Sequence, residues 1–245
     1  MSMSHKIVPY SIGWDVGGWN CDRNAKSRDA IVILNEKLGV VGQPWRGNLR
    51  ETINEASTSR GWVSKLFDLC ESRLSNGDVE VTLAIDTPLG FSTEFQKLVT
   101  SRNPQSTIGP SESNKYLYRK TERLLFKRHK KPLSAIKDMI GSQATKGMHV
   151  LAKFAHQTKS CGVWSDGKIL TAIEAYPASC RESPLTRKLL DKIKLPVANS
   201  DIQHAAICAV VAHIFLTSPK KLWSPSNEIP ISEGWIWLPK DAFAA

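Results

Sequence analysis

The sequence predicts an α/β fold whose first strands form an antiparallel meander. Three short apolar runs rich in β-branched residues follow one another at 7–16, 30–34 and 38–41. Runs of this length that are joined by brief connections favour antiparallel pairing. Further strand-like runs at 79–85 and 169–176 alternate with segments of helical periodicity. The order strand, strand, strand, helix, strand and then further helices indicates the α/β class.

Helices are predicted where apolar residues recur at helical spacing between turn-forming residues. Ser92 is the expected N-cap of one helix, because its hydroxyl can accept a hydrogen bond from an amide of the first turn. The last helix is apolar nearly all round, which predicts a buried position. The aromatic segment at 233–239 is expected to be extended. The predicted helices cover 61–74, 92–100, 142–156, 182–193 and 201–216.

Length, charge and cysteine content limit the possible classes of protein. A chain of 245 residues without a clear linker or repeat predicts one domain (1–245), with a basic helical insertion around 92–158. The net charge of +10 favours a polyanionic partner. Five scattered cysteines argue against a disulfide framework. Because neither a signal-like segment nor a bilayer-length apolar run is evident, we expect a cytoplasmic protein without a membrane partner; no oligomeric state is predicted.

Three aspartates stand at the ends of predicted elements. Asp15 closes the first strand, Asp86 closes the fourth, and Asp201 opens the last helix. Carboxylates so far apart in sequence can share a cation only if these ends are adjacent in space. Hard oxygen ligands suit Mg²⁺ or Mn²⁺, which can activate water for attack on a phosphodiester. The alternative is structural, since aspartates are also common turn formers and helix caps.

Five short motifs occur in the order in which a known family carries them. They are GWDVGGW at 13–19, AIDTPLG at 84–90, YRKTE at 118–122, IEAYPA at 173–178 and DIQHAAICA at 201–209. Together with EGWIWLP at 233–239, they resemble the family catalogued as domain of unknown function 429, which is described as predicted nucleases of RNase H-like fold. The resemblance extends over nearly the whole chain. It implies an RNase H-like mixed sheet, with its first three strands antiparallel and helices on both faces.

The resemblance also implies catalytic and metal-binding residues. Asp15 and Asp86 match the family's strand-end acids, which together with Asp201 are the expected metal ligands. Asp201 and His204 match an Asp-x-x-Asp pair on the last helix, as in bacterial Holliday-junction resolvases, and a spacing of three puts both on one helical face. His204 stands where the second acid is expected. An imidazole can ligate Mn²⁺ or relay a proton but is a poor ligand of Mg²⁺, and a half-buried structural histidine is the alternative.

Two further matched positions have less definite roles. Arg119 and Glu122 fall in the family's Arg-x-x-acid motif, which implies a phosphate-facing arginine near the acidic site with Glu122 in support. The alternative is an exposed helical pair three residues apart. Glu174, at a strand end before Tyr176-Pro177, is a candidate fourth catalytic acid, or it orients a neighbouring basic side chain.

The segment 115–131 carries eight basic residues against the single acid Glu122. Tyr116, Tyr118 and Phe126 are interleaved with them. Lysine and arginine contact phosphates, and aromatic rings stack on unpaired bases, whereas the alternative is a solvated charged surface. The predicted nucleic-acid-binding residues are Arg119, Lys120, Arg123, Lys127, Arg128, Lys130 and Lys131.

These observations predict a metal-dependent nuclease that uses Mg²⁺ or Mn²⁺ and acts on DNA or RNA. A second possibility is a non-catalytic nucleic-acid-binding module on the same scaffold, which His204 in an acidic position favours. A third is an actin-like nucleotide-dependent phosphotransferase, since the turn after Asp15 could hold phosphate. That architecture needs two copies of the core, for which 245 residues is short.

Overall fold

The computed structural model describes residues 7–24, 26–195 and 199–243. Its centre is a mixed sheet in which β1 pairs antiparallel with β2 and parallel with β4. β3 extends the antiparallel part, and β7 lies parallel to β4 on the other side. The prediction of an α/β fold with a mixed sheet and an antiparallel start is therefore confirmed. These strands are β1 (Val8–Asp15), β2 (Asp29–Asn35), β3 (Trp45–Gly47), β4 (Val79–Asp86) and β7 (Leu170–Ala175).

The third strand is not where the sequence predicts it. Residues 36–39 form a tight turn in which Leu38 has a φ of 64° and the amide of Gly39 donates to Oδ1 of Asn35 (2.9 Å). Only a single bridge, between Leu34 and Val40, remains of the expected strand at 38–41. The chain then continues to β3, which pairs with the beginning of β2.

The outer edge of β7 is shared by two partners. Residues 171–173 pair antiparallel with β6, whereas Glu174 and Ala175 pair parallel with β9. The hairpin of β5 and β6 was not predicted, because β5 is exposed throughout and has no apolar face. The extended segment expected at 233–239 contains β9 and so reaches the end of β7. These strands are β5 (Gln157–Ser160), β6 (Val163–Ser165), β8 (Leu222–Trp223) and β9 (Ile236–Pro239).

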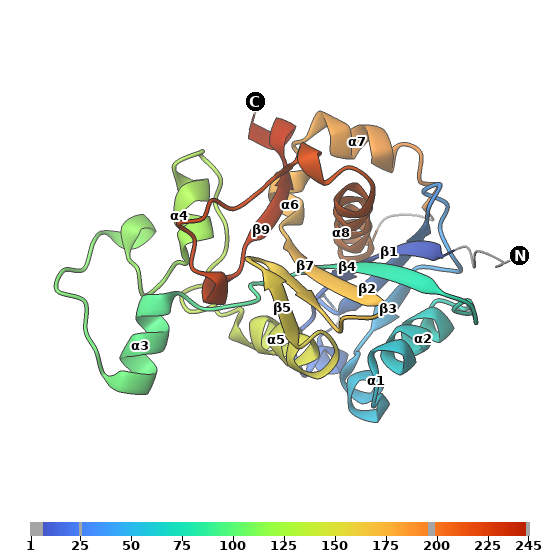
Figure 1. Ribbon diagram of the computed structural model, residues 1–245, viewed down its shortest axis with the longest axis horizontal. Helices are drawn as coiled ribbons and strands as arrows, with labels where there is room; N and C mark the ends of the chain where they lie inside the picture. Colours follow the sequence, from blue (N-terminus) through green and yellow to red (C-terminus); the bar gives the residue numbers. More distant parts are fainter. Residues whose placement is uncertain (1–6, 25, 196–198, 244–245) are drawn as a thin grey trace, which may run out of the picture.

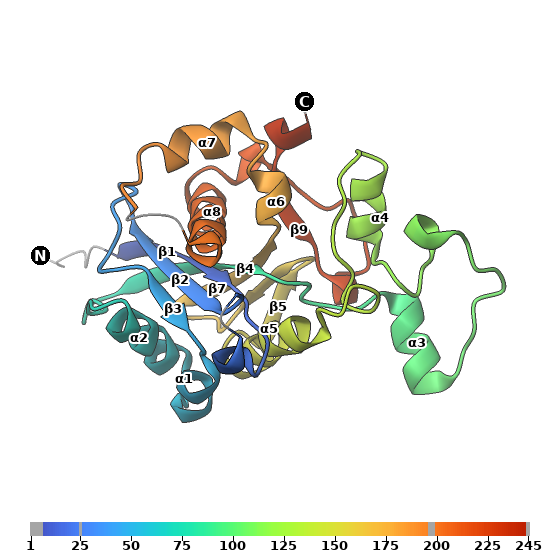
Figure 2. The same cartoon turned by 180° about the vertical axis from the view of Figure 1, so that it is seen from behind.

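Helices cover both faces of the sheet (Figures 1 and 2). Alternation along β2 separates the two cores, since Val32 and Leu34 belong to the α8 side while Ile31 and Ile33 belong to the α2 side. The predicted helix at 182–193 is shorter than expected, because Ser183 caps a new helix that begins at Pro184. Helix α1 was not predicted. The helices of these two layers are α1 (Arg50–Glu55), α2 (Ser59–Leu69), α5 (Gly141–Phe154), α6 (Pro177–Cys180), α7 (Pro184–Leu190) and α8 (Ser200–Thr217).

Helix α8 lies unusually close to β1. A Cβ placed on Gly13 would lie 1.8 Å from the carbonyl oxygen of Ala205 and 2.3 Å from the amide nitrogen of Ala209. Glycine on the strand and alanine on the helix therefore permit this approach. By length and composition alone α8 could cross a membrane, and 61% of it is buried inside the fold.

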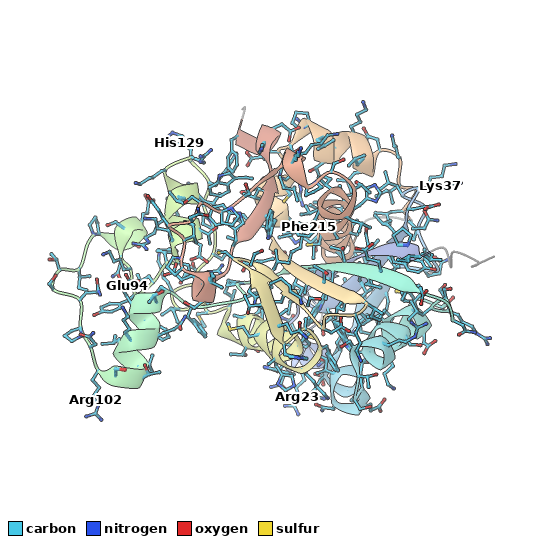
Figure 3. All side chains as sticks on the ribbon, in the orientation of Figure 1. Arg23, Lys37, Glu94, Arg102, His129 and Phe215 are labelled. Atoms are coloured by element: carbon cyan, nitrogen blue, oxygen red, sulfur yellow. The ribbon has the colours of Figure 1, made fainter. Side chains whose placement is uncertain are left out.

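Two helices project beyond the sheet edge that carries β9 (Figure 1). They are α3 (Thr93–Ser101) and α4 (Lys120–Phe126). The predicted cap of α3 is confirmed, since Oγ of Ser92 accepts from the amide of Phe95 (3.1 Å). No residue of α3 is buried, and Arg102 at its outer end points away from the sheet (Figure 3). Short 3-10 turns occupy Cys21–Arg23, Ser111–Ser113, Pro219–Lys221, Ile231–Glu233 and Lys240–Phe243.

Candidate metal centre

Asp15 and Asp86 lie side by side at the carboxyl ends of β1 and β4. The two strands are parallel neighbours, and their register places Asp15 directly opposite Asp86. Both side chains are largely shielded from solvent, with exposed fractions of 14% and 21%. The adjacency expected for these two strand-end acids is therefore confirmed.

His204 on α8 completes a cluster of three. Its Nδ1 lies 3.7 Å from Oδ1 of Asp15 and 3.7 Å from Oδ2 of Asp86. One ligand atom from each of the three residues lies within 4.8 Å of the others, so a single cation could be held between them. The close packing of α8 on Gly13 involves Ala205, the residue that follows His204, and it brings the imidazole to the strand ends.

The electrostatics of the two carboxylates favour a counter-charge. Burial raises the pKa of Asp15, and contact with His204 offsets this only in part. Burial and the adjacent charge of Asp15 raise the pKa of Asp86 well above its ordinary value. Two like charges in a partly dehydrated site repel each other, and a divalent cation bound between them would relieve this repulsion.

The cluster opens into a pocket with a volume of about 220 Å³. Part of its wall is polar, and the buried hydroxyl of Thr87 has no hydrogen-bond partner within the described part of the chain. Another part is apolar, including Leu133, which is 49% exposed. Tyr176 also lines the pocket and donates from its hydroxyl to the carbonyl of Lys131 (2.7 Å). The pocket wall therefore combines polar and apolar side chains beside the three-residue cluster.

Glu174 lines the same pocket, but its carboxylate is already engaged. Nη2 and Nη1 of Arg119 donate to its two oxygens (2.6 and 2.8 Å), and the amide of Leu89 donates to one of them (2.9 Å). Only 2% of Glu174 is exposed. Of its two predicted roles, this geometry favours the orientation of a basic side chain over that of a fourth catalytic acid.

The prediction of a phosphate-facing Arg119 is wrong. Its guanidinium is 2% exposed and also donates to the carboxylate of Glu122 and to the carbonyl of Glu233 (3.0 Å). Glu122 in turn accepts from the amide of Arg119 (2.6 Å) and so satisfies the N-cap amide at the start of α4. The alternative of an exposed pair is also corrected, because both partners are buried. The pair instead joins α4 to the end of β7.

Asp201 is not part of the three-residue cluster. Its Oδ2 accepts from Nε of Arg46 (2.7 Å) and from the amide of Arg28 (3.1 Å). The prediction that Asp201 is a third metal ligand is corrected accordingly: it forms an ion pair with β3. It is still near enough for its charge to raise the pKa of Asp15.

The basic segment divides into structural and solvent-facing side chains. Lys130 is 7% exposed and forms an ion pair with Glu182, so its predicted contact with nucleic acid is wrong. The guanidinium of Arg128 lies over the rings of Trp223 and Phe243, at 4.9 and 4.7 Å from their centroids. Lys127 and Lys131 are exposed, and Lys120 and Arg123 are half-buried.

The fully buried Asp29 supports the site and was not predicted. Its Oδ1 accepts from Nε1 of Trp14 (3.0 Å) and from the amide of Gly17 (2.9 Å). Its Oδ2 accepts from the amide of Leu49 (2.7 Å) and from Nζ of Lys146, which is also fully buried. These bonds hold the residues on both sides of Asp15. An aspartate at the start of an apolar strand gave no signal of this role.

Comparison of the chain with protein-family models, curated proteins and solved structures gives no match. The interpretation of the site as a candidate metal centre therefore rests on its geometry alone. Two strand-end carboxylates and an imidazole surround a space that one divalent cation could fill.

Proposed function

We propose that this chain is a divalent-metal-dependent nuclease that hydrolyses a phosphodiester bond of nucleic acid at Asp15, Asp86 and His204. The observation that carries the proposal is the in-register pairing of Asp15 with Asp86, with His204 Nδ1 3.7 Å from each. When bound, the cation would activate a water and stabilise the leaving oxygen.

The donor set indicates which cation is preferred. Carboxylates suit Mg²⁺ and Mn²⁺ alike, whereas an imidazole is a better ligand for Mn²⁺ than for Mg²⁺. We therefore expect Mn²⁺ to be the stronger activator. His204 is 34% exposed, which also suits a residue that accepts a proton from a water entering the pocket.

The fold supports an RNase H-like assignment. The meander β1–β2–β3 is continued by β4 parallel to β1, and the acids stand at the adjacent ends of β1 and β4. Helix α8 packs on one face of this sheet and places His204 beside the two acids. The net charge of +10 is consistent with a polyanionic substrate.

A non-catalytic nucleic-acid-binding module is the second candidate. It is favoured by the engagement of two predicted acids: Asp201 pairs with Arg46, and Glu174 pairs with Arg119. The cluster has only two anionic ligands, Asp15 and Asp86, whereas the sequence predicts a third, Asp201. Two-metal catalysis depends on such ligands.

Cleavage assays distinguish the two candidates. The wild type and the Asp15→Asn and Asp86→Asn variants would be incubated with labelled single-stranded, duplex, hybrid and branched substrates, in Mg²⁺ and in Mn²⁺. Asp68→Asn serves as the control, because Asp68 is exposed on α2. We expect the wild type and the control to cleave, and EDTA to block this cleavage. Both site variants should be inactive. Binding without cleavage in either metal would favour the module.

A further inference from the structure

The two faces of α4 have different roles. Arg119 and Glu122 point inward and join the helix to Glu174 at the end of β7. Lys120, Arg123 and Lys127 recur at spacings of three and four residues, which places them together on one side of the helix. That side is not used by the acidic centre.

These three residues line a second pocket, with a volume of about 430 Å³. Lys115 contributes a fourth cation from the segment before the helix. Phe126 and Leu124 supply apolar wall, and the only acid is Glu112, which is exposed at the adjacent 3-10 turn. The volume is within the range of ordinary ligand pockets, which runs from about 300 to 1,000 Å³.

The cations of this pocket are not engaged in ion pairs with the described residues. None of the side chains of Lys115, Lys120, Arg123 and Lys127 forms an ion pair or a hydrogen bond with any residue that the structure describes. In addition, Nε of Arg123 is buried and has no acceptor there. A buried donor without a partner is unfavourable, and an acceptor bound beside the Arg123 guanidinium would relieve this.

We propose that this pocket binds a phosphoryl group, at a site separate from the acidic centre. Arginine donates to phosphate in a fixed fork, and lysines add mobile positive charge around it. Phe126 offers a ring for a base or another planar group attached to the phosphate. Two sources share this chemistry: the backbone of a nucleic acid, or a small phosphorylated molecule.

If the phosphoryl group belongs to a nucleic acid, the pocket helps to bind the substrate of the proposed nuclease, and this part of the proposal rests on the proposed function. Because Arg119 fastens α4 to Glu174, which lines the acidic pocket, a strand held on the outer side of α4 would be held at a fixed position relative to Asp15 and Asp86. The second source does not depend on metal chemistry.

The test measures binding in EDTA, so that no cleavage occurs. The variant Lys115→Gln/Lys120→Gln/Lys127→Gln would be compared with Lys188→Gln/Lys192→Gln/Lys194→Gln, which makes the same charge change on exposed lysines in and after α7. A labelled single-stranded oligonucleotide is followed by fluorescence anisotropy, and pyrophosphate by calorimetry. Arg123→Gln removes the guanidinium alone and serves if the triple variant fails to fold.

We expect the pocket variant to bind at least ~10-fold more weakly than the control in at least one arm. For the oligonucleotide, the slope of log K against log salt should fall by about 2, since each phosphate contact on a single strand contributes about 0.7. Loss of oligonucleotide binding identifies a nucleic-acid strand, and loss of pyrophosphate binding alone identifies a small phosphorylated ligand. Affinities that are the same in the pocket and control variants, or no binding of either ligand by the wild type, would overturn the proposal.

The acidic centre is tested independently of this pocket. Asp15→Asn should keep its affinity for the oligonucleotide and for pyrophosphate in EDTA. An inactive acidic centre with intact, lysine-dependent binding would therefore remove the nuclease proposal and leave the pocket. If the protein cleaves nucleic acid but its binding does not depend on the three lysines, the nuclease proposal stands and the pocket proposal is removed.

Discussion

Replacing Asp86 by asparagine should stabilise the protein when no metal is bound. The ligand oxygens of Asp15 and Asp86 lie within 4.8 Å of each other, and two unit charges at that distance repel by about 3.5 kcal/mol at an effective dielectric constant of 20. Exposed fractions of 14% and 21% allow water to screen part of this energy. We therefore expect a gain of about 1–3 kcal/mol, or roughly 2–12 °C in Tm for a chain of this size.

The same substitution should have the opposite effect when Mn²⁺ is present. A ligand at a thousandfold excess over its Kd stabilises a protein by about 4.1 kcal/mol, which exceeds the expected gain, and the variant lacks one anionic ligand for the ion. The order of the two melting temperatures should therefore reverse between EDTA and Mn²⁺. Thermal unfolding at pH 8, followed by circular dichroism or calorimetry, measures both conditions on the same samples.

Asp68→Asn provides the matched control, because it removes one negative charge from an exposed position on α2. It should change Tm by little and should keep the full response to Mn²⁺. The reasoning fails if Asp86→Asn lowers Tm in EDTA. It also fails if Mn²⁺ raises the Tm of Asp86→Asn as much as that of the wild type.

Three further perturbations test the surroundings of the site. Gly13→Ala should cost about 1–3 kcal/mol and weaken the Mn²⁺ response, because its Cβ would lie 1.8 Å from a backbone oxygen of α8; Gly77→Ala, whose nearest contact is at 3.7 Å, should melt like the wild type. Burial raises the pKa of Asp15 and Asp86, so the folded metal-free protein retains protons that the unfolded chain releases. Its stability should fall as pH rises from about 4 through the raised pKa values, and urea melts in EDTA should show a smaller fall for Asp15→Asn. Arg119→Met should lower the free energy of unfolding by about 3–5 kcal/mol, since it leaves two buried carboxylates without a counter-charge; an unchanged urea midpoint would contradict the buried ion pairs.

The sequence is sufficient to predict the two acids because each closes a strand with a clear apolar pattern. β1 and β4 are both long, apolar and followed by turn residues, so their ends could be located to within a residue. The β5–β6 hairpin could not be predicted in this way, because β5 is exposed throughout. The third strand was misplaced because Leu38 lies in a tight turn and Val40 forms only a single bridge with Leu34, although both pack on the core.

The roles of the charged residues were harder to predict, because they depend on partners far away in the chain. Arg119 is buried by contacts with Glu174, 55 positions away, and with Glu233, 114 positions away. Asp201 forms an ion pair with Arg46, which lies 155 positions away. A motif shows that such a residue is charged, but not which side of its helix meets which neighbour. The same limit applies to Lys130, whose partner Glu182 lies in another segment.

The position of α8 late in the chain has a consequence for synthesis on the ribosome. Both strand-end acids emerge early, whereas the helix that packs on β1, β2 and β4 is made only from residue 200 onward. Until then the apolar side chains of Val32 and Leu34 have no layer above them, and Asp15 has no imidazole beside it. We expect the nascent chain to expose this face and to require protection from aggregation by chaperones. The acidic centre would then form only after translation has passed α8.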